Sequence, residues 1–122
     1  MQNKSNLDFT LIAQDFKATR SGKVAYKKLG RNVKSLASFM KSVCNQMLEC
    51  ALVVEPDTNY MLKAMFPTDY WGPLVDKSRD DLRGFRKNIA GRIASYLVDG
   101  GYVPFVKHRT PSGSGSLKYR LK

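Results

Sequence analysis

Apolar residues recur at alternating steps of three and four over residues 32–52, the spacing of one face of an α-helix. The stripe consists of Val33, Leu36, Met40, Val43, Met47 and Ala51. Cys44 lies beside this stripe and Cys50 falls about 120° further round the helix, so we expect two small core residues without a disulfide. The pattern predicts a central core helix over Asn32–Leu52, which we do not expect to be a binding surface.

A second apolar stripe predicts a long helix over Ser78–Val98. It consists of Leu82, Phe85, Ile89, Ile93, Tyr96 and Leu97. Ser78 is the expected N-cap, and Asp81 follows three residues later as in a capping box. Gly100–Gly101 is expected to end the helix.

Five shorter elements follow from weaker patterns. We expect a short helix over Asn6–Phe16, a brief strand at Val24-Ala25-Tyr26, a helix over Asp57–Phe66, and strands over Tyr102–Lys107 and Leu117–Leu121. Gly22 and Gly30 are interpreted as breakers on either side of the first strand. The last two strands enclose a loop rich in Gly and Ser, which predicts a hairpin. The fold class is therefore mostly α with a small C-terminal β-hairpin, an α+β fold.

The chain is long enough for one core and leaves little room for a second, so we expect a single domain over 1–122. No apolar run approaches the roughly 20 residues of a membrane span. The polar start, Met1–Asn6, predicts no secretory signal, and two cysteines cannot form a disulfide framework. We expect a cytoplasmic, reducing location and no membrane partner.

The charge is strongly positive and unevenly distributed. Lys and Arg number 21 against 10 acids, a formal net charge of +11. Residues 1–41 carry +7, residues 42–76 carry −4 and residues 77–122 carry +8, with no acid after Asp99. Two basic flanks around an acidic middle predict surfaces for a polyanionic partner. The plain alternative is that these charges only cover solvated faces.

No catalytic or metal-binding pattern stands out in the sequence. His108 is the single histidine, which excludes most zinc sites and catalytic triads. There is no Gly-rich phosphate loop and no Cys-x-x-Cys pair. Asp80 and Asp81 are adjacent, so on a helix they point about 100° apart and do not converge on one bond. We expect a non-enzymatic protein with no cofactor and no metal.

The polar side of the predicted helix 78–98 is the first candidate binding surface. It carries Gly84, Lys87, Asn88, Gly91 and Ser95, with Arg83 and Arg92 on its flanks. Each glycine inside a helix costs about 1 kcal/mol relative to alanine, so two on an exposed face suggest close approach to nucleic acid. The side chains of Arg83, Lys87, Asn88, Arg92 and Ser95 suit base edges and phosphates. Tight helix–helix packing through the two glycines is the alternative.

Two further basic groups complete the predicted DNA-binding set. The hairpin contributes Lys107, His108, Arg109, Lys118 and Arg120, and the basic N-terminal segment 1–34 contributes Lys23, Lys27, Lys28 and Arg31. Within 117–122 the basic residues alternate with apolar ones, so one face of the strand is expected to meet the core and the other to be cationic.

Residues 57–122 resemble a winged-helix DNA-binding domain, in which a helix pair leads to a recognition helix and then a hairpin whose loop is the wing. The resemblance implies Asp57–Phe66 as the second helix, Ser78–Val98 as the recognition helix and Lys107–Ser116 as the wing. The connector Pro67–Lys77 is longer than the turn usual in such units, and the recognition helix is unusually long.

The expected function is duplex-DNA binding by a transcriptional regulator or a replication or partition accessory factor of microbial, plasmid or phage origin. A helix would enter the groove and the basic hairpin would contact phosphates. Two other classes stay open: an RNA-binding or ribosome-associated protein, and a basic adaptor or inhibitor of an acidic protein surface. A homodimer also stays open.

Overall fold

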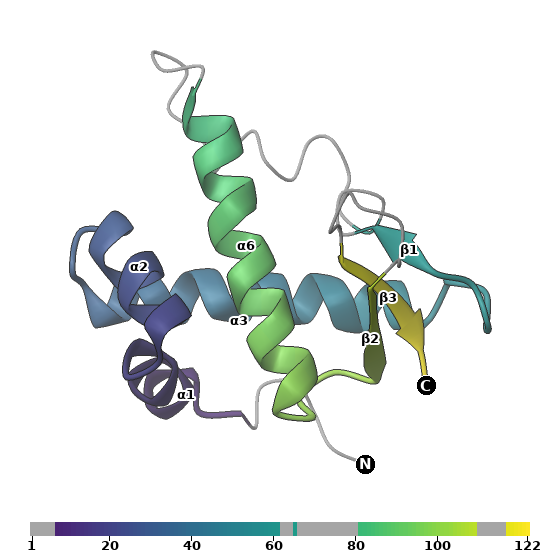
Figure 1. The fold of residues 1–122 in the computed structure, drawn as a ribbon. Coiled ribbons are helices and arrows are strands. Elements are labelled where there is room, and N and C mark those ends of the chain that lie inside the picture. The colour runs from purple at the N-terminus through teal and green to yellow at the C-terminus, as the bar shows by residue number, and fades with distance from the viewer. Residues whose placement is uncertain (1–6, 62–64, 66–80, 110–116) are drawn as a thin grey trace.

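The structure is a computed structural model that describes residues 7–61, 65, 81–109 and 117–122 (Figure 1). The described part has helices α1 (Phe9–Lys17), α2 (Arg20–Lys28), α3 (Val33–Ala51) and α6 (Asp81–Asp99), and strands β1 (Tyr60–Met61), β2 (Phe105–Arg109) and β3 (Leu117–Leu121). The chain is mostly helical with a small C-terminal sheet, which confirms the predicted α+β class.

The elements pack around α3, which α6 crosses (Figure 1). α1 and α2 lie toward one end of α3 and the sheet toward the other. α1 contacts both α2 and α3, and α6 contacts α2, α3 and β2. The N-terminal end of α6 projects beyond the other described helices. Among the described residues, no helix combines the length and apolar character needed to cross a membrane.

The prediction of a core helix over residues 32–52 is confirmed. The inner positions of its apolar stripe, Leu36, Met40, Val43 and Met47, are fully buried. Asn32 is the N-cap, because its side-chain oxygen accepts a hydrogen bond from the Ser35 N–H at 3.2 Å. The helix therefore begins and ends within one residue of the predicted bounds.

Both cysteines of α3 are buried and free of disulfides, as the spacing predicted. The Cys50 thiol donates a hydrogen bond to the carbonyl oxygen of Met65 at 2.7 Å. Burial raises the pKa of this thiol, which keeps it protonated. Cys44 and Cys50 therefore act as core residues.

The predicted strand at Val24-Ala25-Tyr26 is wrong, because residues 20–28 form α2. Thr19 begins the helix: its Oγ1 accepts from the Gly22 N–H at 2.9 Å and donates to the Phe16 carbonyl at 2.7 Å. Gly22 is buried inside α2, where a Cβ would overlap the carbonyl oxygen of Phe16. This glycine therefore permits close contact between α1 and α2, whereas Gly30, at φ 84°, does end the helix.

The predicted helix over Asp57–Phe66 is wrong at its start. Asp57 lies in a turn with φ of 63°, and residues 60–61 form β1, which runs antiparallel to β3. Tyr60 pairs with Tyr119 across this ladder, a contact with a residue far along the chain that no local pattern reports. Most of the remaining predicted helix lies outside the described residues, as do the connector, the helix start at Ser78 and the wing loop.

The C-terminal hairpin is confirmed and gains a third strand. The sheet order is β1-β3-β2, and the register of the hairpin pairs Lys107 with Tyr119 and His108 with Lys118. β3 has the predicted bounds, whereas β2 begins at Phe105 instead of Tyr102. Pro104 precedes β2, which is an edge strand in which a residue without an N–H is tolerated.

α6 buries more of its surface than its large apolar residues predict. Ile89, Ile93 and Leu97 are fully buried as expected, but so are Ala90 and Ala94. Because α6 contacts α2, α3 and β2, more than one of its faces is covered. Tyr96, expected in the buried stripe, is only partly buried. The centroid of its ring lies 4.8 Å from the centroid of the Phe16 ring. Gly101, at φ 75°, follows the helix end as predicted.

Candidate nucleic-acid interface

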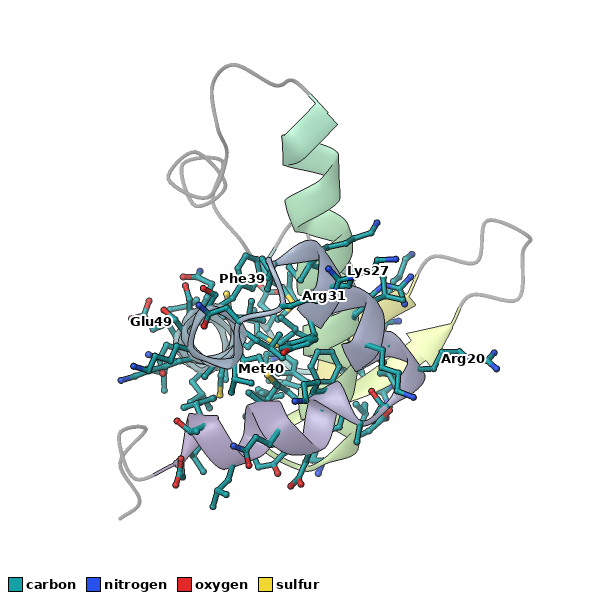
Figure 2. All side chains as sticks on the ribbon, turned by 90° about the vertical axis from the view of Figure 1, so that its left-hand side faces the viewer. Arg20, Lys27, Arg31, Phe39, Met40 and Glu49 are labelled. Carbon is teal, nitrogen blue, oxygen red and sulfur yellow. The ribbon has the colours of Figure 1, made fainter. Side chains whose placement is uncertain are left out.

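α2 carries a stripe of exposed basic side chains. Arg20, Lys23 and Lys27 are exposed and lie three and seven residues apart, so they share one face of the helix. Gly22 and Ala25 form the opposite, buried face. In the part of the chain that the structure describes, no carboxylate pairs with these three side chains. Figure 2 shows the Arg20 side chain extending away from α2.

The remaining N-terminal candidates lie at the end of this helix. Lys28 is exposed in the last turn of α2, and Arg31 is exposed in the turn that follows. Arg31 has a left-handed backbone, with φ of 54°, and its N–H donates to the Tyr26 carbonyl at 2.9 Å. The predicted N-terminal residues are therefore gathered on α2 and its C-terminal turn.

The alternation predicted for β3 is confirmed where the structure describes it. Tyr119 is 1% exposed, whereas Arg120 is exposed and Lys118 is half-buried. Burial, with a contribution from the negative charge of Asp99, raises the pKa of Tyr119 to about 12. Because neighbours along a strand point to opposite faces, Lys118 and Arg120 lie on the face away from Tyr119.

Lys107 differs from the other predicted hairpin contacts because it is paired within the molecule. It is opposite Tyr119 in the register and so shares that face, not the face of Lys118. Its Nζ lies 2.8 Å from Asp99 Oδ1 and donates to Ser95 Oγ at 2.9 Å. Both charged side chains are partly exposed, and such ion pairs contribute only about 0.2–1 kcal/mol. A phosphate group can therefore compete with Asp99 for this ammonium group.

The polar strip of α6 is partly covered, which corrects the expectation of an open face. Gly91, Arg92 and Ser95 are half-buried. Arg92 Nη1 donates to Ser21 Oγ of α2 at 3.1 Å, and Ser95 accepts from Lys107 of β2. The strip is thus bridged to α2 on one side and to the hairpin on the other.

The other predicted residues are described only in part. Arg83, Lys87 and Asn88 belong to the projecting N-terminal end of α6, and His108 and Arg109 to the end of β2. The structure describes the backbone of these residues but not their side chains. The structure brings together the α2 stripe, the α6 strip and Lys107; we call this set the α6 surface.

Several surface residues were missed. Arg20 belongs to the α2 stripe but was left out because residues 24–26 were interpreted as a strand, which hides a helical period. Lys34, Ser35, Ser38 and Lys41 are exposed on α3, on the side away from its apolar stripe. The helical spacing of these polar positions was readable in the sequence, but the helix was interpreted only as core.

Among the described residues, no three His, Cys, Asp or Glu side chains lie together in a way that could hold a metal ion. The chain matches no protein-family model, no curated protein and no solved structure. A functional assignment therefore depends on the residues of the α6 surface and the hairpin.

Proposed function

We propose that this protein is a non-enzymatic duplex-DNA-binding protein, a transcriptional regulator or a replication or partition accessory factor of microbial, plasmid or phage origin. One observation carries the proposal: exposed cations of α2 and the displaceable cation of Lys107 lie on either side of α6. Lysine and arginine are the side chains that neutralise phosphates and release counterions from DNA.

The dimensions of these elements suit a duplex. An α-helix is about 10–12 Å wide with its side chains, and the major groove of B-DNA is about 12 Å wide. Among the described helices, α6 is the one whose N-terminal end projects, and in this proposal that end enters a groove. From Arg20 to Lys27 the α2 stripe extends about 10 Å along the helix, the axial rise of about three nucleotides of one strand.

The hairpin supports the same assignment. α6 leads through Gly100–Gly101 directly into β2 and β3, the order on which the resemblance to winged-helix domains rests. Lys118 and Arg120 form a cationic face on β3. In this proposal α6 reads the groove, α2 contacts one phosphate strand and the hairpin contacts neighbouring phosphates.

The test is a binding titration of the full chain against random-sequence duplex DNA, structured RNA and heparin over a range of salt concentrations. We expect Lys23→Ala/Lys27→Ala to weaken duplex binding and to reduce the log–log salt slope by about 1.8, or about 0.9 for each lost phosphate contact. The control pair Lys23→Arg/Lys27→Arg keeps both charges and should keep the slope.

Three outcomes contradict the proposal. Preference for structured RNA over duplex DNA would place the protein in the RNA-binding class. Binding to none of the three probes at moderate salt would favour the adaptor class. Duplex binding that both α2 variants leave unchanged would move the interface away from the α6 surface.

A further inference from the structure

A short, hydrogen-bonded turn joins α2 to α3. It comprises residues 29–32, and Gly30 and Arg31 both have left-handed backbones, with φ of 84° and 54°. The Arg31 N–H bonds to the Tyr26 carbonyl at 2.9 Å, and Asn32 caps the first turn of α3. In Figure 2, α3 is viewed along its axis while α2 runs across the view. The turn therefore sets the two helices across one another.

α1 holds this pair in place. It contacts both α2 and α3, and its Phe16 is fully buried with Ala25 of α2 and Met40 of α3 in the same core. Two crossing helices joined by a turn of three or four residues that contains glycine form a helix-turn-helix. In DNA-binding units of this kind, the N-terminal residues of the second helix contact base edges in the major groove.

The second helix of the pair, α3, has an open polar side in its first turns. Lys34, Ser38 and Lys41 are exposed and lie four and three residues apart, so they form one stripe, with Ser35 exposed beside it. Figure 2 shows Met40 pointing into the body of the molecule and Glu49 pointing away from it. The exposed side of α3 thus faces away from its contact with α6.

The charge of this side favours a polyanion. No acid occurs between Asp15 and Glu49, and Arg31 is exposed next to the start of α3. Asp8 lines the same open hollow as Lys41, but its carboxylate accepts hydrogen bonds from the Thr10 and Leu11 N–H groups of α1. Lysine and serine side chains can donate to phosphates and to base edges.

The shape favours DNA over RNA. The major groove of B-DNA admits an α-helix, whereas that of an A-form RNA duplex is too deep and narrow for side chains to read. We propose that the α2–turn–α3 unit is a second duplex-DNA-binding surface, the α3 surface, formed by Arg31, Lys34, Ser35, Ser38 and Lys41. This inference rests on the proposed function for its partner and adds a separate site. Because the exposed side of α3 faces away from its contact with α6, a straight duplex bound along α3 does not reach α6, so we expect the chain to hold two duplex segments.

A bridging assay tests the inference. A biotinylated random duplex on beads is saturated with the full chain, and capture of a second, fluorescent duplex is measured. We expect Ser38→Asp to lower this capture at least about tenfold, because it places a negative charge in the centre of the α3 surface. Gln14→Asp, at an exposed position of α1, makes the same charge change and should leave capture within about twofold. Both variants should still bind the immobilised duplex.

A second variant and the parent chain complete the test. Lys34→Gln/Lys41→Gln should also lower capture, with an unchanged melting temperature. Bridging that persists in both α3 variants would overturn the inference and assign the bridging to a dimer of the chain. A parent chain that binds one duplex without bridging would also overturn it and leave the proposed function standing. Failure to bind any duplex would overturn both.

Discussion

The two longest described helices, α3 and α6, have the same length of 19 residues but bury their surfaces in different ways. α3 buries one face and leaves the other open, with Ser38 and Lys41 exposed. In the C-terminal half of α6, large and small residues alike are buried, and Arg92 and Ser95 bond to neighbouring elements. An apolar stripe in the sequence predicts which face of a helix is buried. Whether the opposite face is exposed depends on contacts with other elements, which the stripe does not predict.

The largest expected effect separates the two sides of α3. Met40→Asp should unfold the chain or cause aggregation, because an unpaired charge at a fully buried position costs more than about 4 kcal/mol. Ser38→Asp, two residues away on the exposed side, should keep the fold. Circular dichroism and thermal melting check both variants. A folded Met40→Asp protein would show that α3 is not the core helix.

The next effect concerns α2, which covers one side of α6. Gly22→Ala should destabilise the fold by about 3 kcal/mol, because the methyl group meets the Phe16 backbone and α2 must move. Gly30→Ala is the matched control. A methyl group there meets open space, so the free energy of unfolding should fall only by the strain of the left-handed backbone, about 1–2 kcal/mol. Urea unfolding measures the difference. Equal losses at the two sites would mean that α2 is not held tightly against α1.

These glycines show which helices and strands could be predicted from the sequence. The long stripes predicted α3 and α6 because each repeats one local pattern over many turns. α2 was missed because its short segment is rich in lysine and its Gly22 was interpreted as a breaker, while its role depends on contact with Phe16. β1 was missed because its partner, Tyr119, lies far along the chain.

The candidate site was predictable to a similar extent. The exposed lysines of α2 and the alternation of β3 follow from local sequence, and the structure agrees. The pairing of Lys107 with Asp99 and of Arg92 with Ser21 does not, since each joins two separate elements. Composition therefore predicts how many charged side chains the protein has. Tertiary packing decides which of them are already bonded to other residues of the protein.

The sheet beside α6 makes stability sensitive to alkaline pH. Tyr119 is buried with its pKa raised to about 12 from an ordinary 10, so the folded state keeps a proton that the unfolded state loses. Stability should therefore fall between about pH 10 and pH 12, by up to about 3 kcal/mol. Burial also raises the pKa of Tyr96, which acts in the same direction. Tyr119→Phe should flatten this fall in urea unfolding series, and an unchanged curve would exclude Tyr119 as its cause.

Gly91 tests whether the strip of α6 is open enough to meet DNA. It is half-buried. If its exposed side faces DNA, Gly91→Ala should raise stability by up to about 1 kcal/mol, because alanine is the better helix residue, and should weaken duplex binding, because the methyl group stands between helix and groove. If the strip instead packs against protein, the same change should cost about 1–3 kcal/mol, and binding should fall only with folding. Melting temperature and duplex affinity, measured on one preparation, distinguish the two cases.

The smallest expected effect concerns Asp99, at the end of α6. Its carboxylate engages Lys107 in the unbound protein, so Asp99→Asn should release that ammonium group and remove a negative charge beside the α6 surface. Stability should change by less than about 1 kcal/mol, because the pair is partly exposed. Duplex affinity should rise about threefold with little change in the salt slope, because Lys107 contacts the same phosphate in both complexes and only the competing ion pair with Asp99 is lost. In a Lys107→Ala background the same substitution should bring little further gain, since the two side chains act through one contact. An equal gain in both backgrounds would show that Asp99 acts through general repulsion of DNA, and that Lys107 does not reach a phosphate.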